Sequence, residues 1–144
     1  MCIQYQLGII TNMEDLKDLL QSKKIKPTFQ RLAILKYLHD HKTHPSVERI
    51  YSFLIKQIPT MSRTTIYNTL NMFVQKGLVN LILLSPTEIR YDGDTTFHHH
   101  FLCDSCKSII DIHADCEYGK IGEIQGHKIN EVHGYFKGLC HNCQ

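Results

Sequence analysis

One stretch of 17 residues, 97–113, constrains this 144-residue chain more than any other part of it. The stretch reads FHHHFLCDSCKSIIDIH and combines four histidines, a C-x-x-C pair and an aspartate on an apolar run. Thiolate and imidazole together suit zinc, whereas imidazole with carboxylate suits iron, manganese or cobalt. We therefore expect two metal sites that share this stretch.

The first expected site consists of four cysteines. Cys103-x-x-Cys106 is matched near the C-terminus by Cys140-x-x-Cys143. Each C-x-x-C turn brings two thiolates together, and two such turns complete the tetrahedral sulfur shell of a structural zinc site. The alternatives are two disulfides or four unconnected thiols. We expect one structural Zn²⁺, held by all four sulfurs.

The second expected site is centred on His98 and His100. If this segment is extended, side chains two positions apart share one face, and His99 points the other way. Asp111 follows in a plausible strand, and Asp92 precedes the histidines. The alternative is an exposed polar turn or a tag, but a tag is not expected in mid-chain.

Composition is that of an ordinary soluble protein, with 42% hydrophobic and 21% charged residues. No apolar run approaches the roughly 20 residues that a membrane span needs. Residues 1–12 lack the basic start and apolar core of a signal peptide. Six cysteines without an export signal indicate a reducing compartment, so we expect a cytoplasmic protein without a membrane partner. Cys2 and Cys116 are then ordinary thiols.

Charge divides the chain into two parts. Residues 1–80 contain 11 Lys and Arg against 5 Asp and Glu, a net charge of +6. Residues 81–144 contain 5 against 9, a net charge of −4. This asymmetry suggests that the first part meets a polyanion and that the second part holds cations.

The first part has the periodicity of helices. Four are expected, over residues 13–22, 28–41, 47–56 and 62–76, with Phe29 and Phe53 among the inward-facing residues; two strands follow, over 78–84 and 88–91. Helices followed by a two-stranded ribbon are typical of the winged helix, whose last helix enters the major groove of DNA. The outward face of that helix has no acidic residue and offers hydroxyl, amide, aromatic and cationic groups to phosphates and base edges: Arg63, Thr64, Tyr67, Asn68, Asn71 and Lys76.

Several motifs closely resemble the Fur family of metal-dependent repressors, over about residues 13–143. They are TFQR (28–31), HP (44–45), SRTTIYNTL (62–70) and GLV (77–79), continued by HHH (98–100) and the two C-x-x-C pairs. The resemblance implies an α+β fold and a homodimer that binds a double-stranded operator. Its parts would be a winged-helix DNA-binding domain (1–91), a hinge (92–97) and a small α/β dimerisation domain (98–144). It adds Arg31 to the residues that would contact DNA.

The resemblance also implies a regulatory metal site. The positions that match the family's ligands are His44, Asp92, His98, His100 and Asp111. Three imidazoles and two carboxylates form a five-coordinate set that suits Fe²⁺ or Mn²⁺, or Co²⁺. A sixth, open position would let peroxide reach the iron.

The two aspartates and the ligand spacing resemble PerR, the peroxide-sensing branch. In that branch bound ferrous iron reacts with peroxide and oxidises a ligand histidine, which releases DNA; the matching positions are His44 and His98. The alternative within the same fold is a sensor of iron (Fur) or zinc (Zur) availability. A zinc-dependent hydrolytic enzyme is a distant alternative that lacks a general base, so we expect neither catalysis nor a small organic substrate.

The chain departs from the family pattern in the expected recognition helix, where Arg63 is unusual and Thr64 replaces a common alanine, and in two places of its second part. The helix expected at about 115–125 has poor propensity, because this region is rich in glycine. An accessory third metal site is only partly matched: His133 fits and His99 replaces a usual acid, but Phe97 and Tyr118 have no suitable ligand atom.

Overall fold

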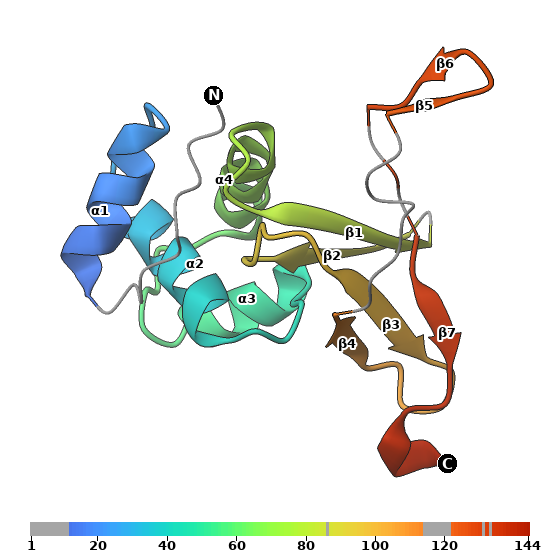
Figure 1. Cartoon of the computed structure of the whole chain (residues 1–144). Helices are drawn as coiled ribbons and strands as arrows, with labels where there is room; N and C mark the ends of the chain where they lie inside the picture. Colours follow the sequence, from blue (N-terminus) through green and yellow to red (C-terminus); the bar gives the residue numbers. More distant parts are fainter. Residues whose placement is uncertain (1–11, 86, 114–121, 131, 133) are drawn as a thin grey trace. The chain divides into compact units, whose positions relative to one another are not determined.

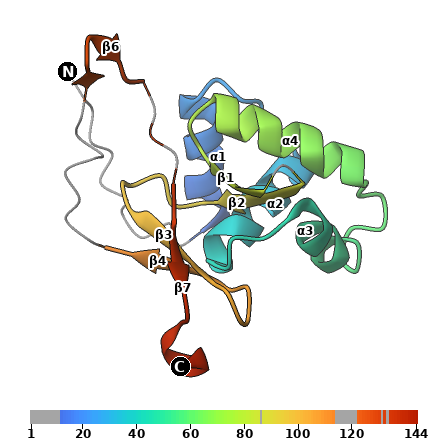
Figure 2. The same ribbon diagram turned by 90° about the vertical axis from the view of Figure 1, so that its right-hand side faces the viewer.

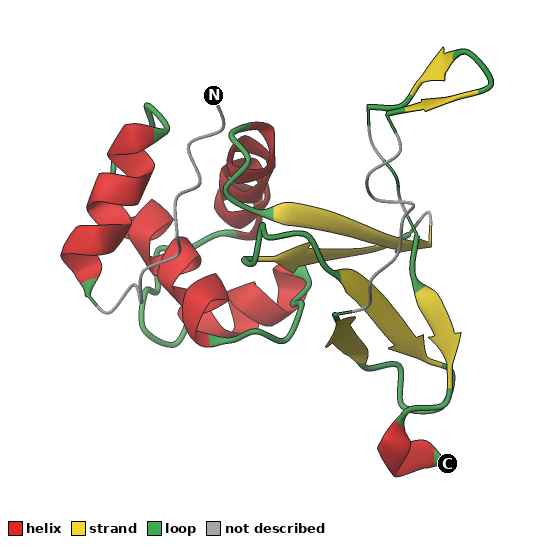
Figure 3. Cartoon of the chain, viewed as in Figure 1, coloured by secondary structure: helices red, strands yellow, loops and turns green. Residues whose placement is uncertain are grey.

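The computed structural model of the chain describes residues 12–85, 87–113, 122–130, 132 and 134–144 (Figure 1). The chain falls into two compact units, residues 1–95 and 96–144. Longer helices occur in the first unit, and the described part of the second contains strands and a short C-terminal helical turn (Figure 3). Within these described ranges, no helix combines the length and the apolar character that crossing a membrane requires.

Side-chain caps begin the first two helices where the sequence predicts. α1 (Met13–Ser22) begins after Asn12, whose side chain accepts hydrogen bonds from two backbone amides in a capping box. α2 (Phe29–Asp40) begins after Thr28, whose hydroxyl accepts from the Arg31 amide. Each cap satisfies donors that the first helical turn leaves without an intrahelical partner.

The next two helices are neighbours in space (Figure 2). α3 (Val47–Leu54) is capped by Ser46 and ends two residues before the predicted Lys56. α4 (Arg63–Gln75) is capped by Ser62, which accepts from the Thr65 amide. Gly77 follows α4 with φ of +66°, the left-handed conformation that commonly ends a helix and that glycine adopts without strain.

The core of the first unit lies between the four helices. Its fully buried members include Leu20, Ile34, Ile50, Ile66 and Phe73. α2 contacts α1, α3 and α4, which explains why it buries residues on more than one face.

Two of the predicted inward residues are exposed instead. Phe29 is the first residue of α2 and is 68% exposed, while Phe53 is 36% exposed. The Phe53 ring packs against Tyr37 and His41 beside a surface groove of about 440 Å³, rather than in the interior.

A two-stranded antiparallel ribbon completes the first unit. β1 (Asn80–Ser85) pairs with β2 (Glu88–Asp92), with Asn80 opposite Asp92. The amide of Tyr91 donates to the carbonyl of Pro45 over 3.0 Å. This bond ties the end of β2 to the connection between α2 and α3.

The second unit is built on a three-stranded sheet of order β4-β3-β7. β3 (His99–Cys103) pairs antiparallel with β4 (Ile109–Ile112) and parallel with β7 (Phe136–Gly138). β5 (Glu123–Ile124) and β6 (His127–Lys128) form a separate hairpin, and the 3₁₀ helix η2 (His141–Cys143) follows β7. Among its described residues, only Cys103 and Cys140 are buried, so the unit has little apolar core.

The sequence pattern made a helix at about 115–125 unfavourable. Residues 114–121 lie outside the described part of the chain. The described end of this range is extended rather than helical, because Glu123 and Ile124 form β5.

Candidate metal centres

Parallel pairing of β3 with β7 brings the two C-x-x-C pairs together. Cys103 ends β3 and lies opposite Gly138 at the end of β7, two positions before Cys140. The turn after Cys103 is closed by two backbone bonds of 3.0 Å, from Lys107 N to Cys103 O and from Cys103 N to Ser108 O. Lys107 has φ of +60°, which folds the turn back on itself.

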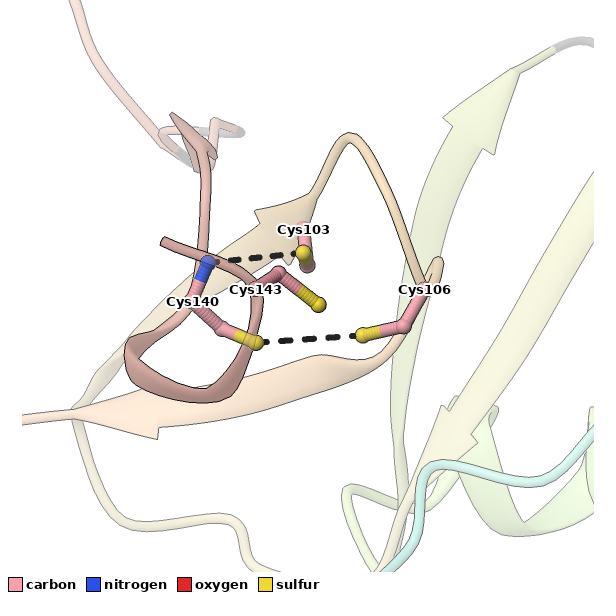
Figure 4. A group of neighbouring side chains, drawn as sticks. All are labelled: Cys103, Cys106, Cys140 and Cys143. Carbon is pink, nitrogen blue, oxygen red and sulfur yellow. Dashed lines mark hydrogen bonds between the residues drawn. The ribbon is translucent and has the colours of Figure 1, made fainter.

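The four sulfurs converge on one point (Figure 4). All of them lie within 4.8 Å of one another, and the sulfurs of Cys106 and Cys140 are 3.9 Å apart. Zinc–sulfur bonds of about 2.3 Å in a tetrahedron require sulfur–sulfur distances of about 3.8 Å. The described cysteines are free thiols, so the disulfide alternative is not observed and the geometry fits one zinc ion.

Hydrogen bonds lower the pKa values of Cys103 and Cys106 and raise that of Cys140. The backbone amide of Cys140 donates to the sulfur of Cys103 and is the largest cause that lowers the Cys103 pKa to about 6. The hydroxyl of Ser108, 3.0 Å from the sulfur of Cys106, is the main cause of the lowered pKa of Cys106. The pKa of Cys140 is raised to about 11, chiefly by its hydrogen bond with Cys143. A divalent cation at the centre of the cluster would displace the protons that the cysteine sulfurs share in their hydrogen bonds.

These pKa values predict acid release of zinc. Because the pKa of Cys103 is depressed, its thiolate persists at neutral pH and is protonated as the pH falls through about 6. Because bound zinc competes with protons for the thiolates, we expect it to be retained at neutral pH and released only at a pH below the value of about 6 that the Cys103 pKa has without metal. A chromogenic chelator measures the release. Ser108→Ala should move the release to higher pH, because it removes the hydroxyl that lowers the pKa of Cys106. Zinc that is already lost at neutral pH, or a Ser108→Ala protein that releases zinc at the same pH as wild type, would contradict this prediction.

The second cluster in this unit contains His98, His100 and Asp111. His100 lies opposite Asp111 in the β3–β4 register. The Nε2 atoms of the two histidines are 3.0 Å apart, and they lie 3.3 and 3.6 Å from Oδ1 of Asp111. His98 immediately precedes β3, so the two imidazoles share a face as the alternation predicts.

A backbone carbonyl orients the first of these imidazoles. Nδ1 of His98 donates to the carbonyl of Thr96 over 2.9 Å, which leaves the Nε2 lone pair for a metal. Two nitrogens at about 2.1 Å from one ion, at right angles, would be about 3.0 Å apart. The 3.0 Å separation of the His98 and His100 nitrogens therefore fits two ligands of one ion. The His99 ring points elsewhere, against Phe97 and Phe136.

The first unit places His44 close to Asp92. Nε2 of His44 is 3.8 Å from Oδ2 of Asp92, and both residues are buried. Oδ1 of Asp92 accepts from the Asp94 amide over 2.8 Å, which orients the carboxylate. His44 precedes Pro45 with φ of +48°, a left-handed conformation that costs a non-glycine residue about 1 kcal/mol or more. Such local strain is typical of a functional position.

Gly93 permits a close approach beside this pair. A Cβ atom at position 93 would lie 3.2 Å from the carbonyl oxygen of Leu38 and 3.3 Å from its Cβ. A larger residue would therefore push the end of β2 away from α2. This packing helps to set the position of Asp92.

The residues predicted to contact DNA lie mostly at the surface of α4. Arg63, Thr64, Tyr67 and Asn68 are exposed, and Asn71 is half-buried. Arg31, on α2, donates from Nη1 to the carbonyl of Lys26 over 2.8 Å. The accessory third site cannot be assembled from described residues, because His133 and Tyr118 lie outside them.

Sequence reasoning missed the residues that orient the candidate ligands. Ser108, the Thr96 carbonyl and the Asp94 amide each hold the side chain of a candidate ligand in place. No motif marks them, because a backbone group carries no sequence signal and one serine is common. Glu48, which pairs with Arg63, was missed because this contact depends on how α3 packs on α4.

Fold and sites together define an α+β protein whose second unit contains a four-cysteine cluster and a histidine–aspartate cluster, both suited to metal ions. The family model described as "Ferric uptake regulator family" matches residues 22–136, and the chain belongs to this family. It is similar to the "Peroxide operon regulator" of Bacillus subtilis (strain 168), with 32% identity over 90% of this chain and 93% of the relative. It is also similar to the "Peroxide-responsive repressor PerR" of Staphylococcus saprophyticus, with 33% identity over 92% of this chain and 91% of the relative.

A solved structure extends the similarity to the fold. The Helicobacter pylori ferric uptake regulator Fur, described as having three functional metal-binding sites, superposes with a TM-score of 0.72. The match covers 92% of this chain and 94% of the Helicobacter pylori chain at 20% identity, so it supports the fold and nothing further.

Proposed function

We propose that this chain is a metal-dependent, DNA-binding transcriptional repressor that responds to peroxide. The observation that carries the proposal is the set of five ligand residues, three histidines and two aspartates, together with relatives named for peroxide response. The relatives are regulators, which supports a regulatory rather than an enzymatic role. We place the protein in the cytoplasm, where DNA is accessible.

The regulatory ligands are divided between the two units. His44 and Asp92 belong to the first, whereas His98, His100 and Asp111 belong to the second. Neither group alone completes a coordination shell, but the five together supply the N3O2 set that suits Fe²⁺ or Mn²⁺. An ion bound by both groups would favour one arrangement of the units over the others, which is how metal occupancy would control DNA binding.

The first unit is the DNA-binding domain in this proposal. α2–α4 and the β1–β2 ribbon have the order of a winged helix, with α4 as the helix that enters the major groove. The residues that would meet DNA are Arg31, Arg63, Thr64, Tyr67, Asn68 and Asn71. The excess of positive charge in residues 1–80 would draw this unit to the phosphates.

The second unit is the dimerisation domain in this proposal. It exposes several large apolar side chains that a partner copy would cover: Ile110, Ile124, Val132, Phe136 and Leu139. The four cysteines would hold a structural Zn²⁺, which compensates for the small apolar core. Residues 92–97 would act as the hinge.

Peroxide sensing would take place at the regulatory site. Ferrous iron, which these five side chains would hold, would supply the electron that cleaves the O–O bond of peroxide, and a neighbouring ligand imidazole would be the group that is oxidised. His44 and His98 are the residues that we expect to be modified. The oriented Nε2 of His98 supports this, because a carbonyl already holds its other ring nitrogen. A modified imidazole binds metal poorly, so DNA would be released.

The test compares iron with manganese. Protein loaded anaerobically with either ion should bind operator duplex, and only the iron form should leave DNA after peroxide, measured by fluorescence anisotropy. Mass spectrometry should then find one added oxygen on His44 or His98. Asp111→Glu serves as the matched variant: we expect it to keep metal-dependent DNA binding and to lose much of the peroxide response. Iron-loaded protein that stays on DNA with both histidines unmodified would instead indicate a sensor of metal availability.

A further inference from the structure

We propose that Glu48 and Tyr51 of α3 hold the guanidinium of Arg63 in the orientation in which it donates hydrogen bonds to a guanine base in the DNA major groove. The inference rests on the proposed binding of DNA by α4. It assigns a specificity-determining role to Arg63 and a positioning role to Glu48 and Tyr51, which do not themselves need to touch the base.

Two side chains from α3 hold Arg63 from different directions. Nε of Arg63 donates to both carboxylate oxygens of Glu48, over 2.7 and 3.0 Å. The central carbon of the guanidinium lies 4.0 Å from the centre of the Tyr51 ring, at cation–π distance. The carboxylate restricts rotation of the guanidinium plane, and the ring supports one face of it.

This arrangement differs from two exposed ion pairs of the same unit that each lie within a single helix. Lys36 and Asp40, and likewise Lys17 and Glu14, join neighbouring turns of one helix through a single contact of 2.8 Å. Such pairs contribute little and fix no particular geometry. The contact of Arg63 with Glu48 instead joins two helices, and it occurs at the first residue of α4.

That position is where recognition helices meet base edges. The N-terminal residues of a recognition helix contact the bases, and arginine pairs with O6 and N7 of guanine through two parallel N–H bonds. Glu48 engages the single Nε–H, while the two terminal amino groups carry four further donors. The two terminal amino groups of Arg63 therefore keep the hydrogen-bond donors that pairing with guanine requires.

The same carboxylate disfavours the alternative target, a phosphate. Glu48 is 63% exposed beside the guanidinium, so its negative charge offsets the attraction of Arg63 for an anion. Guanine offers neutral acceptor atoms and is not repelled in this way. The pair should therefore contribute more to sequence preference than to general affinity for DNA.

Selection from duplexes with a randomised central segment tests this inference, with the manganese-loaded full-length protein as the binder. Wild type should select a G·C pair at one position in each half-site. Arg63→Ala should weaken that preference about tenfold to a hundredfold at that position alone. Glu48→Ala should weaken the same preference several-fold without reducing affinity for random duplex. Glu48→Gln, whose amide oxygen still accepts from Nε, should retain most of the preference.

Asp40→Ala is the matched control, because it breaks an exposed ion pair away from α4 and should leave the selected sequence unchanged. Unchanged zinc content and melting temperature confirm that each variant is folded. Arg63→Ala that weakens binding to all sequences equally would make Arg63 a phosphate contact and overturn the inference. Glu48→Ala that strengthens all binding with an unchanged preference would also overturn it. Wild type that selects no sequence would refute the proposed DNA binding itself.

Discussion

Cys103→Ser should empty the four-sulfur site and unfold much of the second unit. Cys103 lies at the junction of β3 and β7 and is fully buried, and within the described residues of this unit only Cys140 is buried besides it. With so little apolar core, the free energy of folding must come largely from the metal. Structural zinc contributes about 10 kcal/mol or more in small domains of this kind. We expect loss of the ion, loss of the dimer and loss of the β3–β7 pairing.

Three measurements follow this variant: zinc content by atomic emission, mass by light scattering, and amide hydrogen exchange of residues 99–103. Cys2→Ser is the matched control, since Cys2 has no partner at metal-binding spacing, and it should keep both the zinc and the dimer. The backbone amides of the first unit should stay protected from hydrogen exchange in both variants, because the apolar core of this unit consists of its own residues. A Cys103→Ser protein with full zinc content and an intact dimer would refute the structural role.

His44→Asn should abolish metal-dependent DNA binding while leaving the structural zinc in place. Asparagine tolerates a positive φ better than most residues, so the backbone at φ +48° is preserved and the change is confined to the ligand. Loss of one imidazole should weaken Mn²⁺ binding by at least about 100-fold, since even changes outside the ligand shell cost about 10- to 100-fold. In the proposed mechanism an ion that both units bind favours the arrangement competent for DNA, so its loss should release DNA.

Isothermal titration with Mn²⁺ and anisotropy on labelled operator duplex measure these two effects. His127→Ala is the control, because this histidine lies on the exposed β6 strand and belongs to neither cluster. It should bind metal and DNA as wild type does. A His44→Asn protein that still binds DNA only when Mn²⁺ is present would show that the first unit does not contribute His44 to the regulatory site.

Local signals in the sequence determined the helices and the pairs of ligands that are close along the chain. Asn12, Thr28 and Ser62 begin helices where predicted, because an N-cap bond joins residues only two or three positions apart. His98 and His100 share a face because an extended chain alternates its side chains. The spacing of the cysteines likewise predicts the sulfur cluster, because each C-x-x-C turn brings its own two thiolates together.

The tertiary structure alone decided how distant parts meet. Parallel pairing of β3 with β7 explains how Cys103 meets Cys140, and the bond from Tyr91 to Pro45 explains how Asp92 meets His44. The pairing of Glu48 with Arg63 likewise depends on how α3 packs on α4, which neither helix encodes by itself. Contacts of this kind depend on the register of strands and the packing of helices, which are set by the whole core, whereas caps and alternation depend on a few neighbouring residues.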